Sequence, residues 1–207
     1  MDNRRLYIDL HILQTVPPSC INRDDTGSPK TAIYGGTTRA RVSSQAWKRA
    51  VRMMFRDGLL GREQLGERTK KIVAMVAEEV TALAPDADAP KLAKKALESA
   101  GLKKVTEEKG TDALFFMSRA QARALAQLAV DGCGEAKEYK SAIKSAPSVD
   151  MVLFGRMVAS DPSLNYDAAA QVAHSISTHA VQNEYDYFTA MDDLAPEDKA
   201  GAGHLRT

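Results

Sequence analysis

The sequence has few cysteines, no long apolar run and no large excess of charge of either sign. Its two cysteines, Cys20 and Cys133, are too few for a disulfide framework, and neither belongs to a Cys-x-x-Cys motif. No stretch approaches the roughly 18 uninterrupted apolar residues of a membrane span. These absences argue against a disulfide-rich secreted domain, a zinc domain and a membrane protein. A net charge of +1 leaves a polyanionic partner open, because acidic surface can offset a basic face.

Signal and catalytic motifs are absent as well. Asp9 and His11 interrupt the short apolar run near the amino terminus, so we expect no signal peptide and a cytoplasmic protein. No nucleophile elbow, Gly-rich phosphate loop or paired-carboxylate motif is present. Four histidines lack metal-ligand spacing: His11, His174, His179 and His204. We therefore expect no enzyme activity, no metal and no cofactor.

The composition is that of a folded globular protein, with 44% apolar and 27% charged residues. Alternating apolar residues predict a strand over Leu6–Leu13, and prolines and turn formers then predict a long loop as far as Pro29. Further strands are predicted by short β-branched or alternating segments: Thr31–Tyr34, Arg39–Val42, Val149–Phe154 and Gln171–Ser177.

Helices are predicted by apolar periodicity and by capping residues. Ser43 or Ser44 caps a helix whose apolar residues recur at spacings of three and four up to Gly58. The region from about Arg62 to Lys144 is helical in pattern. It includes a helix over Ile72 to Val80, one started by Asp88 and Pro90, and one started by the capping box of Ser118 and Gln121. This order predicts an α+β fold, compatible with a split β-α-β sheet whose connection is expanded into a helical lobe.

Basic residues are segregated between Thr37 and Arg56. This stretch contains six basic residues and no acidic one, although acids are as common as bases in the whole chain. Lys48, Arg52 and Arg56 are spaced four apart and share one face of the expected helix. Like charges at this spacing destabilise a helix by about a few tenths of a kcal/mol per pair, so an external anion would supply a counter-charge. The segment predicts a surface that binds a polyanion.

The start of this helix adds a second attraction for phosphate. The amide hydrogens that follow Ser43 and Ser44, and the positive end of the helix dipole, favour an anion there. The alternative is a solvated basic face whose charges pair with acids elsewhere in the chain. The segment from Asn22 to Asp25 is likewise either an Asx-type turn with a local ion pair or a loop that grips a nucleic-acid backbone.

Several segments together resemble the CasC family, the backbone subunit of the type I-E CRISPR Cascade complex. The resemblance covers most of the chain and is weakest between about Arg62 and Lys144. It is carried, in order, by residues 18–25 (PSCINRDD), 33–36 (IYGG), 39–45 (RARVSSQ), 48–50 (KRA), 155–157 (GRM), 173–179 (AHSISTH) and 186–194 (DYFTAMDDL).

The resemblance implies a hand-like subunit. Residues 1–61 would form the amino-terminal part of a palm with an RNA-recognition-motif-like, or ferredoxin-like, sheet. Residues 62–146 would form a helical fingers insertion, 147–182 further palm strands, and 183–207 a flexible start of a thumb. The chain ends inside this expected thumb, so the palm would be incomplete at its carboxyl-terminal side and would expose a sheet edge. Thr37 and Thr38 also stand where relatives carry basic side chains.

The resemblance also implies site residues and partners. RNA-backbone contacts would come from a loop, a strand and the helix start: Asn22, Arg23, Arg39, Arg41, Ser43, Ser44, Gln45, Lys48, Arg49 and Arg52. Met157 and Phe188 would wedge beside displaced bases, whereas taken alone they would be core residues. The partners would be a guide RNA, other copies of the chain and other Cascade subunits, with target DNA met indirectly by base pairing. Backbone contacts suit this role because they accept any guide sequence.

Two other hypotheses compete with this one. A metal-dependent RNA-cleaving backbone subunit, as in type III complexes, would use Asp24 or Asp25 as its candidate acid. A purely structural module would instead dock its basic helix on an acidic protein partner and would purify without nucleic acid.

Overall fold

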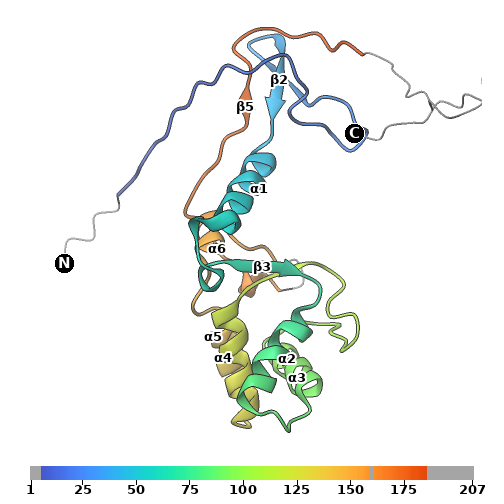
Figure 1. Cartoon of the computed structure of the whole chain (residues 1–207), viewed down its shortest axis with the longest axis vertical. Helices are drawn as coiled ribbons and strands as arrows, with labels where there is room; N and C mark the ends of the chain where they lie inside the picture. Colours follow the sequence, from blue (N-terminus) through green and yellow to red (C-terminus); the bar gives the residue numbers. More distant parts are fainter. Residues whose placement is uncertain (1–5, 159–160, 186–207) are drawn as a thin grey trace, which may run out of the picture. The chain divides into compact units, whose positions relative to one another are not determined.

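The computed structural model describes residues 6–158 and 161–185 of the chain. The chain divides into two compact units: unit 1 comprises Met1–Val42 and Ser175–Thr207, and unit 2 comprises Ser43–His174. Unit 1 contains a small sheet, and unit 2 contains all six α-helices of the described residues (Figure 1). The four-part division expected from the family resemblance stays a prediction.

Unit 1 is built on an antiparallel hairpin. Strand β1 (Thr31–Tyr34) pairs with β2 (Thr37–Val42), and Tyr34 lies opposite Thr37 in the register. Two residues, Gly35 and Gly36, connect the strands, and both have positive φ angles, of 63° and 72°. That conformation is the one that a type I′ hairpin turn requires, which explains the Gly-Gly pair. Strand β5 (Ser175–Ile176) pairs with the other end of β2 and completes a sheet of order β1-β2-β5.

Two predicted strands of unit 1 are corrected. Leu6–Leu13 forms no strand, and its apolar side chains are exposed, for example Leu6 at 85% and Leu13 at 91%. An alternating segment becomes a strand by pairing, and no described strand pairs with this one. The second predicted strand, Gln171–Ser177, is confirmed only at Ser175 and Ile176.

Unit 2 begins with helix α1 (Ser44–Met54), which continues through a π-helical turn over Phe55–Leu59. Its remaining elements are a 3-10 turn (Arg62–Gln64), β3 (Gly66–Thr69), α2 (Ile72–Leu83), α3 (Ala89–Ser99), β4 (Phe115–Ser118), α4 (Arg119–Val130), α5 (Ala136–Ala142), α6 (Val149–Phe154) and a second 3-10 turn (Pro162–Leu164). Strands β3 and β4 pair antiparallel, with Arg68 opposite Phe116.

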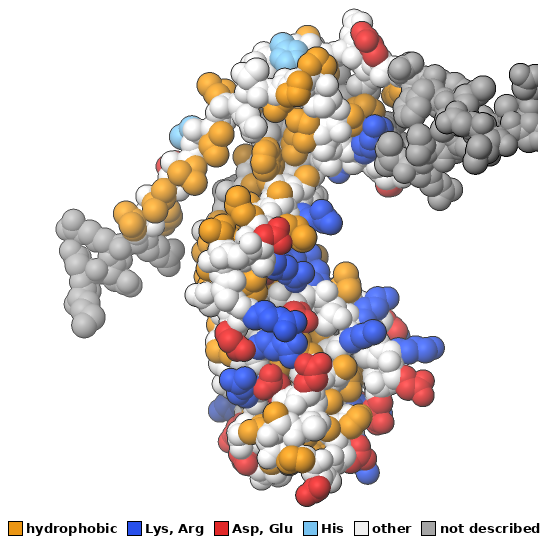
Figure 2. Space-filling view, viewed as in Figure 1, with side chains coloured by type: hydrophobic (Ala, Val, Ile, Leu, Met, Phe, Trp, Pro, Cys, Tyr) orange, Lys and Arg blue, Asp and Glu red, His pale blue; other side chains and the backbone are white. Residues whose placement is uncertain are grey.

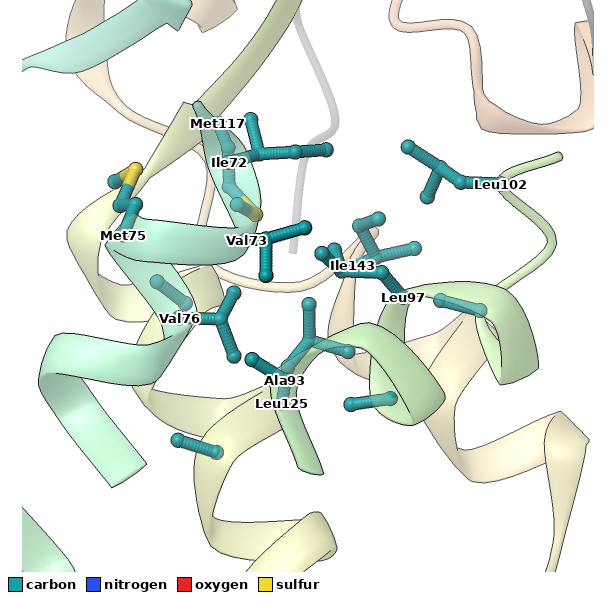
Figure 3. Packing of buried hydrophobic residues seen from close by; sticks show 14 of the residues in the cluster. Ile72, Val73, Met75, Val76, Ala93, Leu97, Leu102, Met117, Leu125 and Ile143 are labelled. Carbon is teal, nitrogen blue, oxygen red and sulfur yellow. The ribbon is translucent and has the colours of Figure 1, made fainter. Parts of the chain in front are cut away.

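The hydrophobic core of unit 2 lies among helices α2, α3, α4 and α5, which pack side by side (Figure 1). Figure 3 shows side chains from these helices and from β4 pointing toward one another. Several are fully buried: Ile72, Val76, Leu97, Met117, Leu125 and Ile143. Burying a large aliphatic side chain stabilises a fold by about 1.5–3 kcal/mol, so this cluster is the main source of stability in unit 2.

Predicted caps set the boundaries of three helices. The Asp88 side chain accepts a hydrogen bond from the amide of Lys91 at the start of α3. The Ser118 hydroxyl accepts from the amide of Gln121, and the Gln121 side chain accepts from the amide of Ser118. Both halves of the predicted capping box are therefore present. The predicted helix after Ser43 is also confirmed.

Two predictions for unit 2 are wrong in type. Val149–Phe154 is helix α6, not a palm strand, because a short apolar run does not distinguish the two by periodicity. The helix ends at Gly155, whose φ of 76° suits glycine, and a Cβ at this position would lie only 2.8 Å from the carbonyl oxygen of Tyr166. Strands β3 and β4 lie in the region predicted to be helical throughout. The α+β class is confirmed, and the RNA-recognition-motif-like arrangement stays a prediction.

Candidate nucleic-acid interface

The predicted RNA-binding residues are divided between the two units, with Asn22, Arg23, Arg39 and Arg41 in unit 1. The other six lie in unit 2, spread from the N-cap of α1 to its last turn. Figure 2 shows Lys and Arg side chains gathered over the middle of unit 2, with Asp and Glu side chains among them.

The first turn of helix α1 is free of acidic residues that would repel an anion. The Ser43 hydroxyl accepts a hydrogen bond from the amide of Ala46 at 3.4 Å, so this side chain caps the helix. No acidic residue lies in the first turn. Ser44 is half-buried and Gln45 is exposed. An anion at this end of α1 would meet the positive end of the helix dipole without repulsion from an acidic residue of the first turn.

Lys48 and Arg49 are the cationic side chains of α1 that no other described residue pairs with. Lys48 is half-buried and Arg49 is exposed. Neither forms an ion pair or a hydrogen bond with any other residue of 6–158 and 161–185. For these two side chains, the alternative of a basic face paired within the chain finds no support in the described part of the molecule.

Arg52 differs, and here the predicted row of unpaired charges is wrong. Its Nε donates to Oδ2 of Asp150 at 2.9 Å, and the Asp150 side chain is 1% exposed. The other oxygen of Asp150 accepts from the amide of Gly66 at 2.9 Å. The guanidinium of Arg52 also lies over the ring of Phe116, 4.7 Å from its centroid. Arg52 therefore links α1 to β3, β4 and α6, and its contact with RNA stays a prediction.

The loop of unit 1 is an Asx-type turn. Oδ1 of Asp24 accepts hydrogen bonds from the hydroxyl and amide of Thr26 and from the amide of Ser28. The Thr26 hydroxyl, more than any other contact, lowers the pKa of Asp24 below its ordinary value. The Arg23 guanidinium donates to the carbonyl of Gly27 at 2.8 Å. The turn is thus confirmed, with Arg23 on a carbonyl and not in an ion pair.

Arg39 and Arg41 stand two apart on β2 and so face the same side of the sheet. Arg39 donates from Nε to the carbonyl of Tyr34 and from Nη1 to the carbonyl of Ser177, both at 3.0 Å. It thereby ties the hairpin to the segment after β5. Nε of Arg41 is buried and has no hydrogen-bond acceptor among the described residues. A buried donor without an acceptor costs free energy, so this Nε destabilises unit 1 slightly as it stands.

Met157 is 85% exposed and directly follows a buried residue. The preceding residue, Arg156, is 4% exposed and donates to carbonyls of Leu164, Phe116 and Ile143. Burial lowers the pKa of Arg156 to about 10. Exposure of Met157 is compatible with the predicted base wedge, which stays a prediction. Phe188 lies outside the described residues.

Sequence reasoning missed Arg156 as a buried hub, and it missed Arg68. Arg68 lies on β3 with its guanidinium 5.3 Å from the centroid of Phe116. Arg156 belongs to segment 155–157, which resembles the CasC family, but the sequence of that segment does not reveal that the side chain is buried. Arg68 belongs to a strand that pairs across about 50 residues of sequence, so no local signal marked it.

Other kinds of site find no basis in the described residues. They contain no group of three or more His, Cys, Asp or Glu side chains that could hold a metal ion. Two surface hollows of unit 2, of about 340 and 400 Å³, include none of the predicted RNA-binding residues. Within the same residues, no helix has the length and apolar character needed to cross a membrane.

Comparison with known proteins places the chain among CRISPR proteins. Two similar solved structures are chains titled "CRISPR RNA-guided surveillance complex" and "CRISPR RNA-guided surveillance complex, pre-nicking". The first is 35% identical with a TM-score of 0.64 and covers 81% of this chain; the second is 36% identical with a TM-score of 0.71 and covers 91%. Each match spans 57% of the solved chain. A search of curated proteins found no match.

A family model gives the more specific assignment. The model described as CT1975-like protein matches residues 8–207, and the chain belongs to this family. Together with the two solved structures, the match confirms the resemblance to the backbone subunit of a CRISPR surveillance complex.

Proposed function

We propose that this chain is a non-catalytic subunit that holds a guide RNA by its phosphates in a Cascade surveillance complex of antiviral defence. The observation that supports the proposal most directly is the pair Lys48 and Arg49, which have no partner among the described residues and follow the acid-free start of α1. A ribose-phosphate strand would supply the counter-charge that the chain itself does not.

Contacts of this type carry no sequence information. Cationic side chains and helix amides bind phosphate oxygens, which are the same for every nucleotide. A subunit that uses such contacts accepts any guide and leaves the base edges free to pair with target DNA. Arg41, which is half-buried on β2, and the exposed Met157 are the further residues that we assign to this role.

Helix α1 also supports membership in an assembly. It buries no residue, and its apolar side chains Trp47, Met53 and Met54 are 36%, 42% and 57% exposed. Apolar side chains gathered on one helix are typical of a protein contact. We assign these side chains to contacts with other copies of the chain or with other subunits of the complex.

The lack of catalysis in the proposal rests on the state of Asp24. Its Oδ1 accepts three hydrogen bonds from Thr26 and Ser28, so this oxygen serves the turn. A metal-dependent nuclease would need such an oxygen for its ion, with further ligands beside it. Incubation of RNA with magnesium should therefore yield no evenly spaced cuts, and cuts that disappear in Asp24→Ala would contradict the proposal.

The decisive test is RNA binding by the double variant Lys48→Ala/Arg49→Ala of the 207-residue chain. Fluorescence anisotropy with a labelled single-stranded RNA, at several salt concentrations, gives the affinity and its salt dependence. Removal of one phosphate-binding cation should lower the slope of log affinity against log salt by about 0.7, so we expect a decrease of about 1.4 for the double variant. The decrease should be the same for RNAs of different sequence.

Arg123→Ala is the matched control for this test. Arg123 is also a basic residue of unit 2, but Nε of its guanidinium donates to Glu79 at 3.0 Å. Its loss should leave the slope unchanged. Equal slopes for the wild type and the double variant would show that α1 is not the RNA-binding surface, and absence of RNA binding by the wild type would refute the proposal itself.

A further inference from the structure

Three guanidinium groups from different parts of unit 2 converge around Gly66 and Phe116. Nη2 of Arg52 and Nη2 of Arg56 each lie 3.5 Å from the carbonyl oxygen of Gly66. The ring of Phe116 has Arg52 at 4.7 Å and Arg68 at 5.3 Å from its centroid. Because Arg56 follows α1 and Arg68 lies on β3, the fold itself assembles this cluster.

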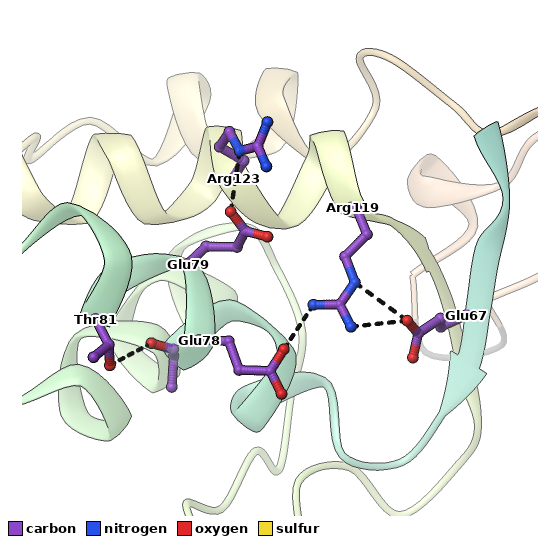
Figure 4. A network of polar contacts seen from close by, with 7 residues as sticks. Glu67, Glu78, Glu79, Thr81, Arg119 and Arg123 are labelled. Atoms are coloured by element: carbon purple, nitrogen blue, oxygen red, sulfur yellow. Dashed lines mark hydrogen bonds and ion pairs between the residues drawn. The ribbon is translucent and has the colours of Figure 1, made fainter. Parts of the chain in front are cut away.

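Among the described residues, one carboxylate, that of Asp150, contacts this cluster. Both of its oxygens already accept hydrogen bonds. Asp150 accepts from Arg52 with one oxygen and from the amide of Gly66 with the other, both at 2.9 Å. Arg56 and Arg68 have no carboxylate partner in residues 6–158 and 161–185. Glu67, the neighbour of Arg68 on β3, accepts from Arg119 instead (Figure 4). Two of the three positive charges therefore have no counter-charge.

The local electrostatics agree with an excess of positive charge. Burial first and the charge of Arg52 second lower the pKa of Arg68, while Asp150 partly opposes this effect. Like charges held close together by a fold cost free energy, and a bound anion would relieve that cost. The guanidinium of Arg68, held near the ring of Phe116, is a planar group that can donate two parallel hydrogen bonds to an anion.

We propose that Arg56 and Arg68 bind a phosphodiester group of single-stranded RNA, which continues the cationic face of α1 onto β3. The inference rests on the proposed function and extends it to residues that the family resemblance did not indicate. Lys48, Arg52 and Arg56 are spaced four apart, so this face runs about 12 Å along the helix. A polymer with a charge at every repeat fits such a row better than a single protein carboxylate does.

The test compares Arg68→Ala with Lys95→Ala in the full 207-residue chain. Lys95 is an exposed base on α3 without an ion pair to a described residue, so the control removes the same charge elsewhere in unit 2. Anisotropy titrations use a labelled uridine oligomer and a DNA oligomer of matched length. We expect Arg68→Ala to weaken RNA binding about tenfold, the effect of one charged hydrogen bond, and to lower the salt slope by about 0.7.

The remaining outcomes are distinguishable. Arg68→Lys should recover part of the affinity, since it keeps the charge but not the planar group, and thermal unfolding confirms that each variant is folded. An unchanged RNA affinity for Arg68→Ala, combined with a loss for Lys48→Ala/Arg49→Ala, would overturn this inference and leave the proposed function standing. A loss confined to DNA, or to capture of an acidic protein, would also overturn it. No RNA binding by the wild type would overturn both.

Discussion

Helices α4 and α1 both belong to unit 2, yet their side chains are satisfied in different ways. On α4, Leu125 is fully buried, Arg119 binds Glu67 and Glu78, and Arg123 binds Glu79 (Figure 4). On α1, no residue is buried, and Lys48 and Arg49 pair with no described residue. A helix that completes the core has internal partners for its charges, whereas α1 keeps both apolar and basic groups for contacts outside the described chain.

Arg52 is the exception that makes the comparison informative. It shares one face of α1 with Lys48 but binds the buried Asp150, which lies 98 residues away in the sequence. The basic face of α1 therefore has two roles. Arg52 holds α1 on the rest of unit 2, and Lys48 and Arg49 remain available for an external anion.

Substitution of a core residue should produce the largest difference between α4 and α1, measured as the change in the free energy of unfolding. Replacing Leu125 by Ala on α4 removes a fully buried side chain and should lower the free energy of unfolding by about 3 kcal/mol. Replacing Met54 by Ala on α1 should change it by less than about 0.5 kcal/mol, since Met54 is 57% exposed. Urea unfolding followed by circular dichroism measures both. Similar losses would mean that α1 is packed in solution.

Breaking the Arg52–Asp150 pair should have the next largest effect. Asp150→Asn leaves the Arg52 guanidinium, which is 17% exposed, without its counter-charge. We expect a loss of about 2–3 kcal/mol, below the usual cost of breaking a fully buried pair because Arg52 reaches water. Glu78→Gln is the control, because Glu78 is 64% exposed in its pair with Arg119, and it should cost less than about 1 kcal/mol. Equal losses of stability for Asp150→Asn and Glu78→Gln would mean that Arg52 does not hold α1 in place through a buried ion pair.

The turn of unit 1 provides the smallest effect and a test by pH. Because hydrogen bonds from Thr26 and Ser28 lower the pKa of Asp24 below 3.8, the stability that this carboxylate gives the turn is present above that value. It is lost as the pH falls through the lower, folded-state pKa. The amide proton shifts of Thr26 and Ser28 should therefore titrate with a midpoint below 3.8, and Asp24→Asn should abolish the transition. A midpoint at or above the ordinary value would contradict the turn.

Features with a local cause could be predicted from the sequence. Ser43, Asp88 and Ser118 cap their helices through atoms within three residues, and the Gly35-Gly36 pair defines its own turn. Strands β3 and β4 could not be predicted, because each is short and its pairing is decided by a partner about 50 residues away. The segment Val149–Phe154 was predicted as a strand, since six mostly apolar residues carry too little periodicity to reveal a helix.

The candidate site shows the same limit. Segregation of charge between Thr37 and Arg56 is a property of neighbours in the sequence and could be predicted. The partner of Arg52 is a property of the fold, because Asp150 meets it only after β3 and α6 have packed. The same holds for Arg68, whose place over Phe116 depends on the register of β3 with β4.

Arg156 and the surface lysines should respond differently to salt. Its guanidinium is almost fully buried and hydrogen-bonds to neutral acceptors alone among the described residues. Mobile ions screen a buried charge much less than an exposed one. The hydrogen bonds by which Arg156 joins α6, β4 and the segment after α5 should therefore persist at high ionic strength, whereas the contacts of the exposed lysines with an anion should weaken.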